Sequence, residues 1–380
     1  MSLSPTELAR YQRHLSLAEI GAAGQEKLKR ARVLVIGAGG LGSPSSLYLA
    51  ASGVGTLGIV DCDRVEVSNL QRQVLFDTPG LDRSKAEAAR ERLQALNPEI
   101  SVIAHTLELR AHNVRAVLQD YDVVLDGTDR MATRFLVNDA CVMLGKPLVS
   151  AAIHRFEGQA MTYVPGRGPC YRCLFPEPPA AGTVPSCAEA GVLGVLPGVL
   201  GSIQATEAIK LIVGAGEPLV GRLLTYDALE MRFQEFTFTR RVDCAVCGDR
   251  PTITELKDPP GLCSAETLSR LRRLAPHELD ALMASADAGG IAIIDVREPG
   301  EFAVSHLPTA QNIPVGELAR RIAELPPIVT PVFICRTGTR SLMACDIAVN
   351  AGFAAPAHLE GGLLAWASQI NPSLAVAPVK

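Results

Sequence analysis

Residues 32–53 read RVLVIGAGGLGSPSSLYLAASG, a short apolar run followed by a glycine-rich turn and a segment of helical composition. Within this stretch, Gly37, Gly39 and Gly42 satisfy the pattern G-x-G-x-x-G. Glycines at these positions let the backbone approach a phosphate group at the N-terminus of the following helix. The stretch predicts a strand, a tight turn and a helix that together open a nucleotide-binding fold.

The alternation of strand and helix continues over the first 250 residues. Further apolar runs are LGIVD (57–61), ISVIAHT (100–106), DVVLDG (122–127) and PLVSAA (147–152), with helical patterns between them. Buried strands that alternate with helices predict a Rossmann-like, doubly wound α/β sheet. From residue 157 the chain is rich in proline and glycine and predicts a loop, followed by a helix over 198–213. The strand-like runs LLTYDAL and FQEFTF then predict a mixed or antiparallel extension of the sheet.

A second domain follows a segment with the composition of a linker. Residues 251–275 are rich in prolines and charges and have only weak periodicity. The runs IAIIDV, PVFIC and RSLMACDIAVNAG beyond it alternate between strand and helix character. We expect a first domain over 1–250, a linker over 251–275 and a smaller α/β domain over 276–380.

Composition and charge exclude several classes of protein. The chain has 380 residues, a net charge of -4 and an isoelectric point near 6.0, so it lacks the basic field that binds nucleic acid. Its N-terminus has no signal-peptide pattern, and we find no apolar run of about 18 residues or more. These features predict a cytoplasmic protein with no membrane segment. In such a chain the ten cysteines are expected to be metal ligands or reactive thiols rather than disulfides.

The polar stretch DCDRVEVSNLQRQ (61–73) distinguishes two kinds of nucleotide enzyme. Asp61 alone suits a nicotinamide-dependent dehydrogenase, whose acidic residue binds the ribose hydroxyls. Hydride transfer has no use for the cluster that follows, whereas adenylation needs Arg72 and Lys85 to hold the triphosphate as pyrophosphate leaves. Asp129 follows the fourth strand, at the edge where such sheets bind ligands, and is a candidate ligand for Mg²⁺. The stretch favours adenylation over hydride transfer.

Four motifs carry a resemblance to a known family. GAGGLG, DCDRVEVSNLQRQ, GTDRMATRFLVNDAC and CYRCLFPEPP resemble the MoeB/ThiF branch of the ubiquitin-activating superfamily over about residues 6–250. The resemblance implies an ATP site formed by Gly39, Asp61, Ser68, Asn69, Leu70, Gln71, Arg72 and Lys85. It also implies that Asp129 holds Mg²⁺ and that Arg13 reaches the triphosphate from the partner subunit of a homodimer. Arg130 stands where the family usually has asparagine, and an added cation there does not oppose phosphate binding.

Two C-x-x-C pairs predict a metal site. Cys170 with Cys173, and Cys244 with Cys247, can each offer two thiolates to one tetrahedral Zn²⁺. The alternatives are chance pairs of core cysteines and a redox dithiol. No water-activating residue accompanies the pairs, so we expect a structural zinc knuckle, in agreement with the resemblance.

The remaining cysteines outside the second domain's active loop differ in their expected roles. Cys187 lies in the loop VPSCAEAGVLG, and in related proteins fused to a rhodanese domain the matching cysteine is assigned to a covalent acyl step. The alternative is an ordinary loop thiol. A second set is interpreted as small packing residues, namely Cys62, Cys141, Cys263 and Cys345.

The second domain carries its own candidate nucleophile. IIDVREPGEFAVSHLPTAQNIP and VFICRTGTRS resemble the rhodanese family over about residues 276–370. Cys335 ends a strand, and the turn to Arg340 directs amides and two arginines at its sulfur, which favours a thiolate and an anionic persulfide. A cysteine phosphatase usually has five residues between cysteine and arginine, whereas four separate Cys335 from Arg340. An inactive docking module usually lacks the cysteine. The sequence favours sulfur transfer.

Three functions stay open at this point. The first is adenylation of the C-terminal glycine of a ubiquitin-like sulfur-carrier protein, using ATP, Mg²⁺ and Zn²⁺, followed by sulfur transfer from Cys335 and cleavage by Cys187. The second is a non-catalytic scaffold for such a partner, and the third is a nicotinamide-dependent oxidoreductase. The sequence does not distinguish molybdopterin, cysteine, thiamine or tRNA thiolation as the pathway. It also does not distinguish a cysteine desulfurase from thiosulfate as the sulfur donor.

Overall fold

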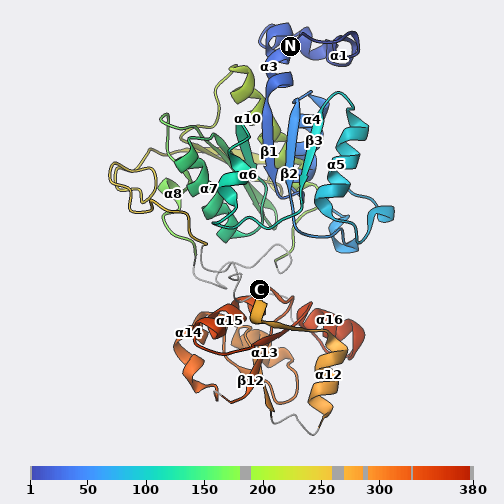
Figure 1. Ribbon diagram of the computed structural model, residues 1–380, viewed down its shortest axis with the longest axis vertical. Helices are drawn as coiled ribbons and strands as arrows, with labels where there is room; N and C mark the ends of the chain where they lie inside the picture. Colours follow the sequence, from blue (N-terminus) through green and yellow to red (C-terminus); the bar gives the residue numbers. More distant parts are fainter. Residues whose placement is uncertain (1, 180–189, 259–268, 286–289, 327, 377–380) are drawn as a thin grey trace. The chain divides into compact units, whose positions relative to one another are not determined.

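The structure is a computed structural model that describes residues 2–179, 190–258, 269–285, 290–326 and 328–376. The chain divides into two compact units (Figure 1). The first contains residues 2–178 and 192–257. The described residues of the second are 179, 190–191, 258, 269–285, 290–326 and 328–376. Each unit has its own sheet and its own apolar core.

The first unit is built on an eight-stranded sheet with the order β3-β2-β1-β4-β5-β6-β7-β8. The strands are β1 Arg32–Ile36, β2 Thr56–Val60, β3 Ser101–His105, β4 Val123–Asp126, β5 Leu148–His154, β6 Glu157–Tyr163, β7 Arg222–Asp227 and β8 Arg232–Thr237. The first five are parallel and the last three are antiparallel additions. This arrangement confirms the predicted doubly wound sheet and its antiparallel extension.

Helices of the first unit pack against this sheet. They are α1 Pro5–Arg10, α2 Gln12–Leu15, α3 Gly21–Arg30, α4 Gly42–Ala51, α5 Lys85–Leu96, α6 Val114–Leu118, α7 Met131–Leu144, α8 Tyr171–Leu174 and α10 Leu196–Val213. Figure 1 shows α5 beside the outer strands β2 and β3. On β1, Val33 and Val35 point into one core with Leu49 of α4 and Leu93 of α5. Strand side chains alternate between faces, so the buried Leu34 and Ile36 serve the opposite face.

Strand β6 corrects one expectation. The sequence predicted a loop from residue 157, but Glu157–Tyr163 pairs with β5 along its whole length. The hairpin turns at Arg155, which adopts a left-handed conformation with φ 53°. A glycine or asparagine usually marks such a turn, and the sequence there offers neither.

Helix α10 is the core helix of this unit. It contacts α3, α4, β5 and β6, and its Leu196 and Leu200 are fully buried. Of the helices described, α10 alone is long and apolar enough to cross a membrane, with a hydropathy of 1.2 over 18 residues, half of them buried inside the protein. A core helix that packs between a sheet and other helices can have the same length and apolar composition as a membrane-spanning helix.

The second unit has a five-stranded parallel sheet with the order β11-β10-β12-β13-β9. Its strands are β9 Arg272–Leu274, β10 Ile291–Asp295, β11 Gln311–Asn312, β12 Thr330–Ile334 and β13 Ala357–Leu359. Its helices are α12 Pro276–Ala284, α13 Pro299–Val304, α14 Val315–Arg321, α15 Thr339–Asn350 and α16 Gly362–Gln369. Strand β9 lies inside the segment 251–275 that the sequence assigned to the linker, and it pairs with β13.

Two cores cover the two faces of this second sheet. Ile294 and Phe333 belong to one core, and their neighbours Ile293 and Val332 belong to the other. Trp366 of α16 is 4% exposed and packs in the second of these cores. It is also the chain's single tryptophan.

Candidate functional site

The glycines of the turn after β1 differ in the space beside them. Gly37 has φ 86°, a left-handed conformation that favours glycine. A methyl group on Gly42 would overlap the carbonyl oxygen of Gly37, so this position has no room for a side chain. A methyl group on Gly39, in contrast, would come no closer than 3.6 Å to another residue, at Nε2 of Gln73. The turn therefore exposes backbone at Gly39, where a phosphate could approach.

Asp61 holds this turn against the end of β2. One carboxylate oxygen accepts a hydrogen bond from the amide of Ala38 (2.8 Å), and the other accepts one from the amide of Asp63 (2.8 Å). Burial raises the pKa of Asp61, and the nearby charge of Lys85 opposes that rise. Each oxygen keeps a lone pair that ribose hydroxyls could use.

Lys85 starts α5 beside this acidic edge, as predicted. Its side chain is 7% exposed, and Nζ lies 3.2 Å from Oδ2 of Asp63, which is itself exposed. A lysine ammonium has three N–H donors, so this ion pair leaves donors for a phosphate. The stretch 61–85 thus places one carboxylate and one cation next to the glycine turn.

The polar segment after the short 3-10 helix Val67–Asn69 packs over the glycines. Arg72 donates from Nη1 to the carbonyl of Ser68 (3.1 Å), and its Cδ would lie 3.7 Å from a methyl group on Gly40. Asn69 is buried, Leu70 half-buried, and Ser68 and Gln71 are exposed. The fold therefore brings the predicted residues 68–72 together with Gly39, Asp61 and Lys85.

Gln73, the last residue of the polar stretch 61–73 that favours adenylation, also lies beside the glycine turn. It is 4% exposed, and its Oε1 has no hydrogen-bond partner among the residues described. Its Nε2 is the neighbour nearest to the open side of Gly39. The sequence signal for Gln73 is its position at the end of the SNLQRQ run.

Two aspartates after β4 have different environments. Asp126 is fully buried and accepts hydrogen bonds from Thr128 and from the hydroxyl of Ser150 (3.1 Å), with Nε of Arg134 3.4 Å away. Asp129 is exposed in the turn before α7. Of these two aspartates, Asp129 is the one that presents an exposed carboxylate at the carboxyl edge of the sheet, where a magnesium ion could bind.

Arg130 is held by an ion-pair chain that the sequence did not reveal. Its Nη1 lies 2.9 Å from Oε1 of Glu108, and Oε2 of Glu108 lies 2.6 Å from Nη2 of the buried Arg110. Burial alone would lower the pKa of Arg130, but the charges of Asp63 and Glu108 raise it overall. The guanidinium is thus directed to the carboxyl ends of β2 and β3.

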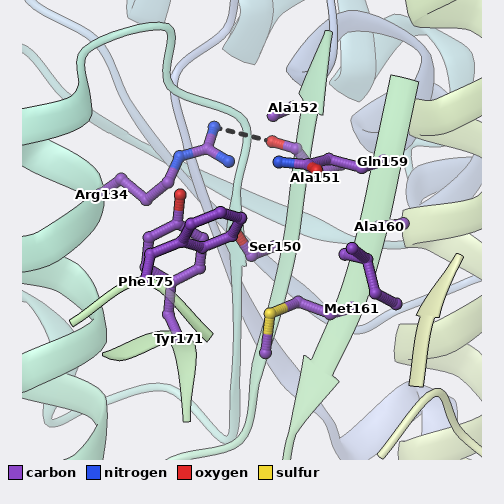
Figure 2. A pocket seen from close by; sticks show the side chains of 10 residues that line it. Arg134, Ser150, Ala151, Ala152, Gln159, Ala160, Met161, Tyr171 and Phe175 are labelled. Atoms are coloured by element: carbon purple, nitrogen blue, oxygen red, sulfur yellow. Dashed lines mark hydrogen bonds between the residues drawn. The ribbon is translucent and has the colours of Figure 1, made fainter. Parts of the chain in front are cut away.

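A small recess lies between α7 and the strands β5 and β6 (Figure 2). Its empty space of about 170 Å³ includes open solvent, so the recess is not an enclosed ligand pocket. Figure 2 shows Arg134 reaching the carbonyl of Ala151 (2.8 Å), with Tyr171 and Phe175 beside it. Arg134 also donates to the carbonyl of Thr128 (2.8 Å), so it ties the loop before α7 to β5.

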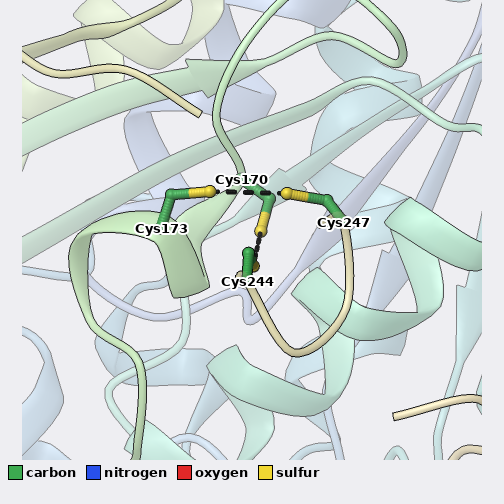
Figure 3. Close-up of side chains that lie close together, drawn as sticks. All are labelled: Cys170, Cys173, Cys244 and Cys247. Carbon is green, nitrogen blue, oxygen red and sulfur yellow. Dashed lines mark hydrogen bonds between the residues drawn. The ribbon is translucent and has the colours of Figure 1, made fainter. Parts of the chain in front are cut away.

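The four knuckle cysteines converge on one point (Figure 3). Their sulfur atoms lie within 4.8 Å of one another, with 3.7 Å between Cys170 and Cys244 and 3.4 Å between Cys173 and Cys247. Zinc–sulfur bonds of about 2.3 Å place tetrahedral sulfurs about 3.8 Å apart. The cluster therefore fits a zinc site.

A buried ion pair anchors this cluster to α7. Arg172, between two of the cysteines, makes a bidentate contact with Asp139 of α7 (2.7 and 2.8 Å). Asn138 accepts a hydrogen bond from the amide of Tyr171 (2.8 Å). Bidentate arginine–carboxylate pairs fix geometry as well as charge.

In the second unit, Cys335 directly follows β12 and is fully buried. Its sulfur accepts the amide of Gly338 (3.1 Å), which has φ 99° and begins the turn into α15. The predicted turn that directs an amide at the sulfur is therefore present.

Both arginines that support the loop are paired inside the protein. Arg340 binds Glu301 of α13 through two contacts (2.7 and 2.9 Å), and Arg297 binds Asp295 at 2.7 Å with both side chains fully buried. Burial would raise the pKa of Glu301, but hydrogen bonds and charge from Arg340 lower it overall. The Asp295–Arg297 ion pair lies directly after β10. Glu301 was missed because it lies 39 residues from Arg340.

Six predicted residues need separate mention. Arg13 lies exposed on α2. Cys187 and Cys263 lie outside the described residues. Cys141 and Cys345 are buried, but the prediction that Cys62 packs in a core is wrong, because it is exposed at the carboxyl end of β2.

The chain's sequence matches two families in the same order. The ThiF family matches residues 11–246, more than half of the chain. The chain belongs to the ThiF family. A rhodanese-like domain matches residues 275–369 of this ThiF protein.

Relatives and solved structures agree with this assignment. This ThiF protein is 48% identical to a probable adenylyltransferase/sulfurtransferase MoeZ of Mycobacterium tuberculosis, over 98% of this chain and 96% of that protein. It is 53% identical to a sulfur carrier protein adenylyltransferase of Thermus thermophilus, over 69% of this chain and 99% of that protein. The structure of E. coli MccB with ATP has a TM-score of 0.56 and 28% identity, covering 64% of this chain and 75% of that chain.

The four-cysteine cluster of this ThiF protein gives a first prediction. We expect about one Zn²⁺ per purified chain, since a closed tetrahedral site takes one ion. Cys173→Ser should lower that content by more than about half and lower the melting temperature, because a hydroxyl is a poor zinc ligand. Metal analysis with calorimetry checks this, and Cys62→Ser, at an exposed thiol, should keep the metal. Metal-free wild-type protein would contradict the expectation.

The second unit of this ThiF protein should lose stability in mild acid. Burial and the charge of Arg273 lower the pKa of His358 from 6.5 to about 4. Below about pH 6.5, His358 binds a proton in the unfolded chain but not in the folded one. The contribution of His358 to stability is therefore complete above that pH and falls toward pH 4. The loss should approach about 3 kcal/mol.

Urea unfolding followed by Trp366 fluorescence measures this effect in the full chain, because Trp366 reports only the second unit. His358→Phe should flatten the dependence between pH 7 and pH 5. Glu301 loses its stabilising charge only below its ordinary value of 4.5, outside that range. An unchanged slope in the variant would assign the effect to another group.

Proposed function

We propose that this protein adenylates the C-terminal glycine of a ubiquitin-like sulfur-carrier protein with ATP and then converts it to a thiocarboxylate. The observation that carries the proposal is the presence, in one chain, of the glycine-turn site with Lys85 and Arg72 and of the buried Cys335 loop. The names of the relatives in Mycobacterium tuberculosis and Thermus thermophilus support both halves. They give no support to the scaffold or the nicotinamide-dependent alternative.

The first half-reaction makes the carboxylate a better electrophile. A carboxylate oxygen of the carrier attacks the α-phosphorus of ATP, and pyrophosphate leaves with the electron pair of the broken P–O bond. The amides near Gly39 and the cations Arg72 and Lys85 would stabilise the charge on the phosphates. Asp129 would hold Mg²⁺, which neutralises phosphate charge when bound. Arg13 would act from the partner subunit of a homodimer, and Arg130 would contact the nucleotide.

The second half-reaction replaces oxygen by sulfur. The terminal sulfur of a Cys335 persulfide attacks the acyl-adenylate, forming a C–S bond and releasing AMP. A thiolate, proposed as that of Cys187, then attacks the Cys335 sulfur, so the thiocarboxylate leaves and a disulfide forms between the two cysteines. Two cellular thiols, or one dithiol, must supply the two electrons that reduce this disulfide and become a disulfide themselves. The donor of the persulfide sulfur would be a cysteine desulfurase or thiosulfate.

The setting of the reaction follows from its chemistry. Zinc thiolates and a persulfide require a reducing compartment, so we propose a cytoplasmic location. Of the possible pathways, we propose that the carrier serves molybdenum cofactor biosynthesis. Zn²⁺ bound by the four knuckle cysteines would be structural, because the cluster leaves no ligand position open.

The proposed activation is tested by ATP–pyrophosphate exchange with each ubiquitin-like carrier encoded in the same genome. Exchange should appear with one carrier and disappear when its terminal glycine is removed. Addition of a persulfide donor and a thiol should then give the thiocarboxylate. If no carrier stimulates exchange, the proposal of carrier activation fails.

A further inference from the structure

A second layer of polar side chains lies behind the sulfur of Cys335. The hydroxyl oxygen of Ser341, in the first turn of α15, is 3.7 Å from the sulfur. Nδ1 of His358, on β13, is 3.4 Å from the same hydroxyl. Ser341 is fully buried and His358 is 3% exposed. Cys335, Ser341 and His358 therefore form a continuous buried row.

The position of the proton on His358 follows from its surroundings. Burial and the charge of Arg273 lower its pKa to about 4, so the ring is neutral near pH 7 and carries one N–H. Nε2 has no hydrogen-bond partner among the residues described. A buried donor without a partner is rarer in proteins than an under-satisfied acceptor. The proton therefore belongs on Nδ1, from which it is donated to Ser341.

The hydroxyl of Ser341 has one hydrogen and two possible acceptors. With Cys335 as a thiol, the S–H can donate to Ser341, and Ser341 donates to the carbonyl of Gly338 (2.8 Å). When Cys335 is a thiolate, its sulfur becomes an acceptor toward which the hydroxyl can rotate. Gly338 then still accepts the amide of Leu342 (3.1 Å), so no carbonyl is left without a donor.

We propose that Ser341 and His358 form a hydrogen-bond relay that stabilises negative charge on the sulfur of Cys335. Ser341 would be a catalytic residue, since it contacts the reacting atom, and His358 a positioning residue that acts through Ser341. The proposal rests on the proposed role of Cys335 as the sulfur-transfer nucleophile. It adds a side-chain donor opposite the amide of Gly338.

The Ser341 hydroxyl adds a donor to the charged groups that surround the Cys335 loop. Arg340 shares its charge with Glu301, and Arg297 shares its charge with Asp295. Arg336 adjoins the sulfur along the chain, and Arg273 lies on β9, next to the strand of His358. The paired guanidiniums are held by carboxylates, whereas the Ser341 hydroxyl can move its proton to the sulfur as charge appears there.

Thiosulfate and cyanide provide a balanced test reaction that needs neither ATP nor carrier. The Cys335 thiolate attacks the outer sulfur of thiosulfate, an S–S bond forms, and sulfite leaves with the electron pair of the old bond. Cyanide then attacks the outer sulfur of the persulfide, thiocyanate leaves, and the electron pair of the S–S bond returns to Cys335. The Cys335 sulfur carries negative charge at the start of the first step and at the end of the second, and the relay would stabilise that charge.

Ser341→Ala in the full chain should lower the turnover of this reaction by about tenfold to a hundredfold, the usual effect of losing a hydrogen bond to a charged group. Ser341→Thr keeps the hydroxyl and should recover most of the rate. Ser368→Ala is the matched control, because that helical hydroxyl also donates to a carbonyl three residues earlier but faces no sulfur. Its rate should equal that of the wild type.

Alkylation by iodoacetamide, followed by peptide mass spectrometry, separates a chemical role from a structural one. Loss of thiolate stabilisation slows alkylation of Cys335, whereas loosening of the domain speeds it. Cys345, fully buried four residues after Ser341 on the same helix, reports loosening directly and should stay unreactive. His358→Phe should slow Cys335 by about threefold to tenfold. Alkylation of Cys335 should be faster in His358→Asn than in His358→Phe, because the asparagine amide can donate a hydrogen bond in place of Nδ1–H.

The outcomes decide the proposal. Wild-type rates of turnover and alkylation in Ser341→Ala overturn it, and so does faster alkylation of both Cys335 and Cys345. If Ser341→Ala does not fold, His358→Phe against His358→Asn decides, and equal rates in those two variants overturn the relay. Failure of the wild type to make thiocarboxylate on any carrier, with thiosulfate turnover intact, would instead refute the proposed function and leave the relay standing.

Discussion

Cys335→Ala is expected to abolish thiocarboxylate formation, with a loss of about a thousandfold or more, because no persulfide can form without the thiolate. The same variant should still exchange pyrophosphate with ATP at the wild-type rate, since activation uses the first unit. Mass spectrometry of the carrier measures the outcome, because replacement of one oxygen by sulfur adds about 16 Da. The carrier should fail to gain this mass.

Two further variants control this experiment. Cys345→Ala removes a buried thiol from the same core without touching the loop and should keep the activity. Cys187→Ala should be milder than Cys335→Ala, because an external thiol can reduce the acyl-disulfide in its place. If Cys335→Ala formed thiocarboxylate at the wild-type rate, sulfur would reach the adenylate by another route, and the second unit would serve only for docking.

Lys85→Ala and Asp129→Ala are expected to lower carrier-dependent pyrophosphate exchange by about a hundredfold to a thousandfold, the scale on which oriented charges stabilise a transition state. Lys85 is buried beside Asp63, and Asp129 is exposed at the edge of the sheet. The Asp129 variant should in addition need more Mg²⁺ for half-maximal rate. Exchange kinetics with a magnesium titration measure both effects.

The matched control is Arg83→Ala. Arg83 precedes α5 by two residues, is exposed, and pairs with Glu91 on the surface, so it carries the same charge near Lys85 without entering the site. Its removal should leave exchange unchanged. A variant of Lys85 or Asp129 with undiminished exchange would remove that residue from the proposed nucleotide site.

Local patterns were sufficient for most of the fold. The apolar runs predicted β1 to β4 to within one residue at either end, because each is buried and bounded by polar or glycine residues. The prediction missed β6, since the turn at Arg155 carries its left-handed conformation without glycine. It also placed β9 in the linker, because three residues are too few to show a period.

For the candidate sites, the sequence revealed residue types but few of their partners. Lys85, Arg72 and Gly39 were found from motifs, and the fold brings them together. Glu108 and Glu301 were not found, because each pairs with an arginine more than 20 residues away. Pairing across such separations depends on how elements pack, and periodicity within one segment carries no information about it.

The ion pair between Arg340 and Glu301 limits how the loop's sequence can change during evolution. Replacing either residue alone leaves a charge in a buried site without the partner it binds, which typically costs about 3–5 kcal/mol. Exchanging both for apolar side chains of similar volume can be nearly neutral. A lineage can therefore reach the apolar solution only through a paired change or a less stable intermediate. Positions 301 and 340 should vary together, and their substitution effects should not add.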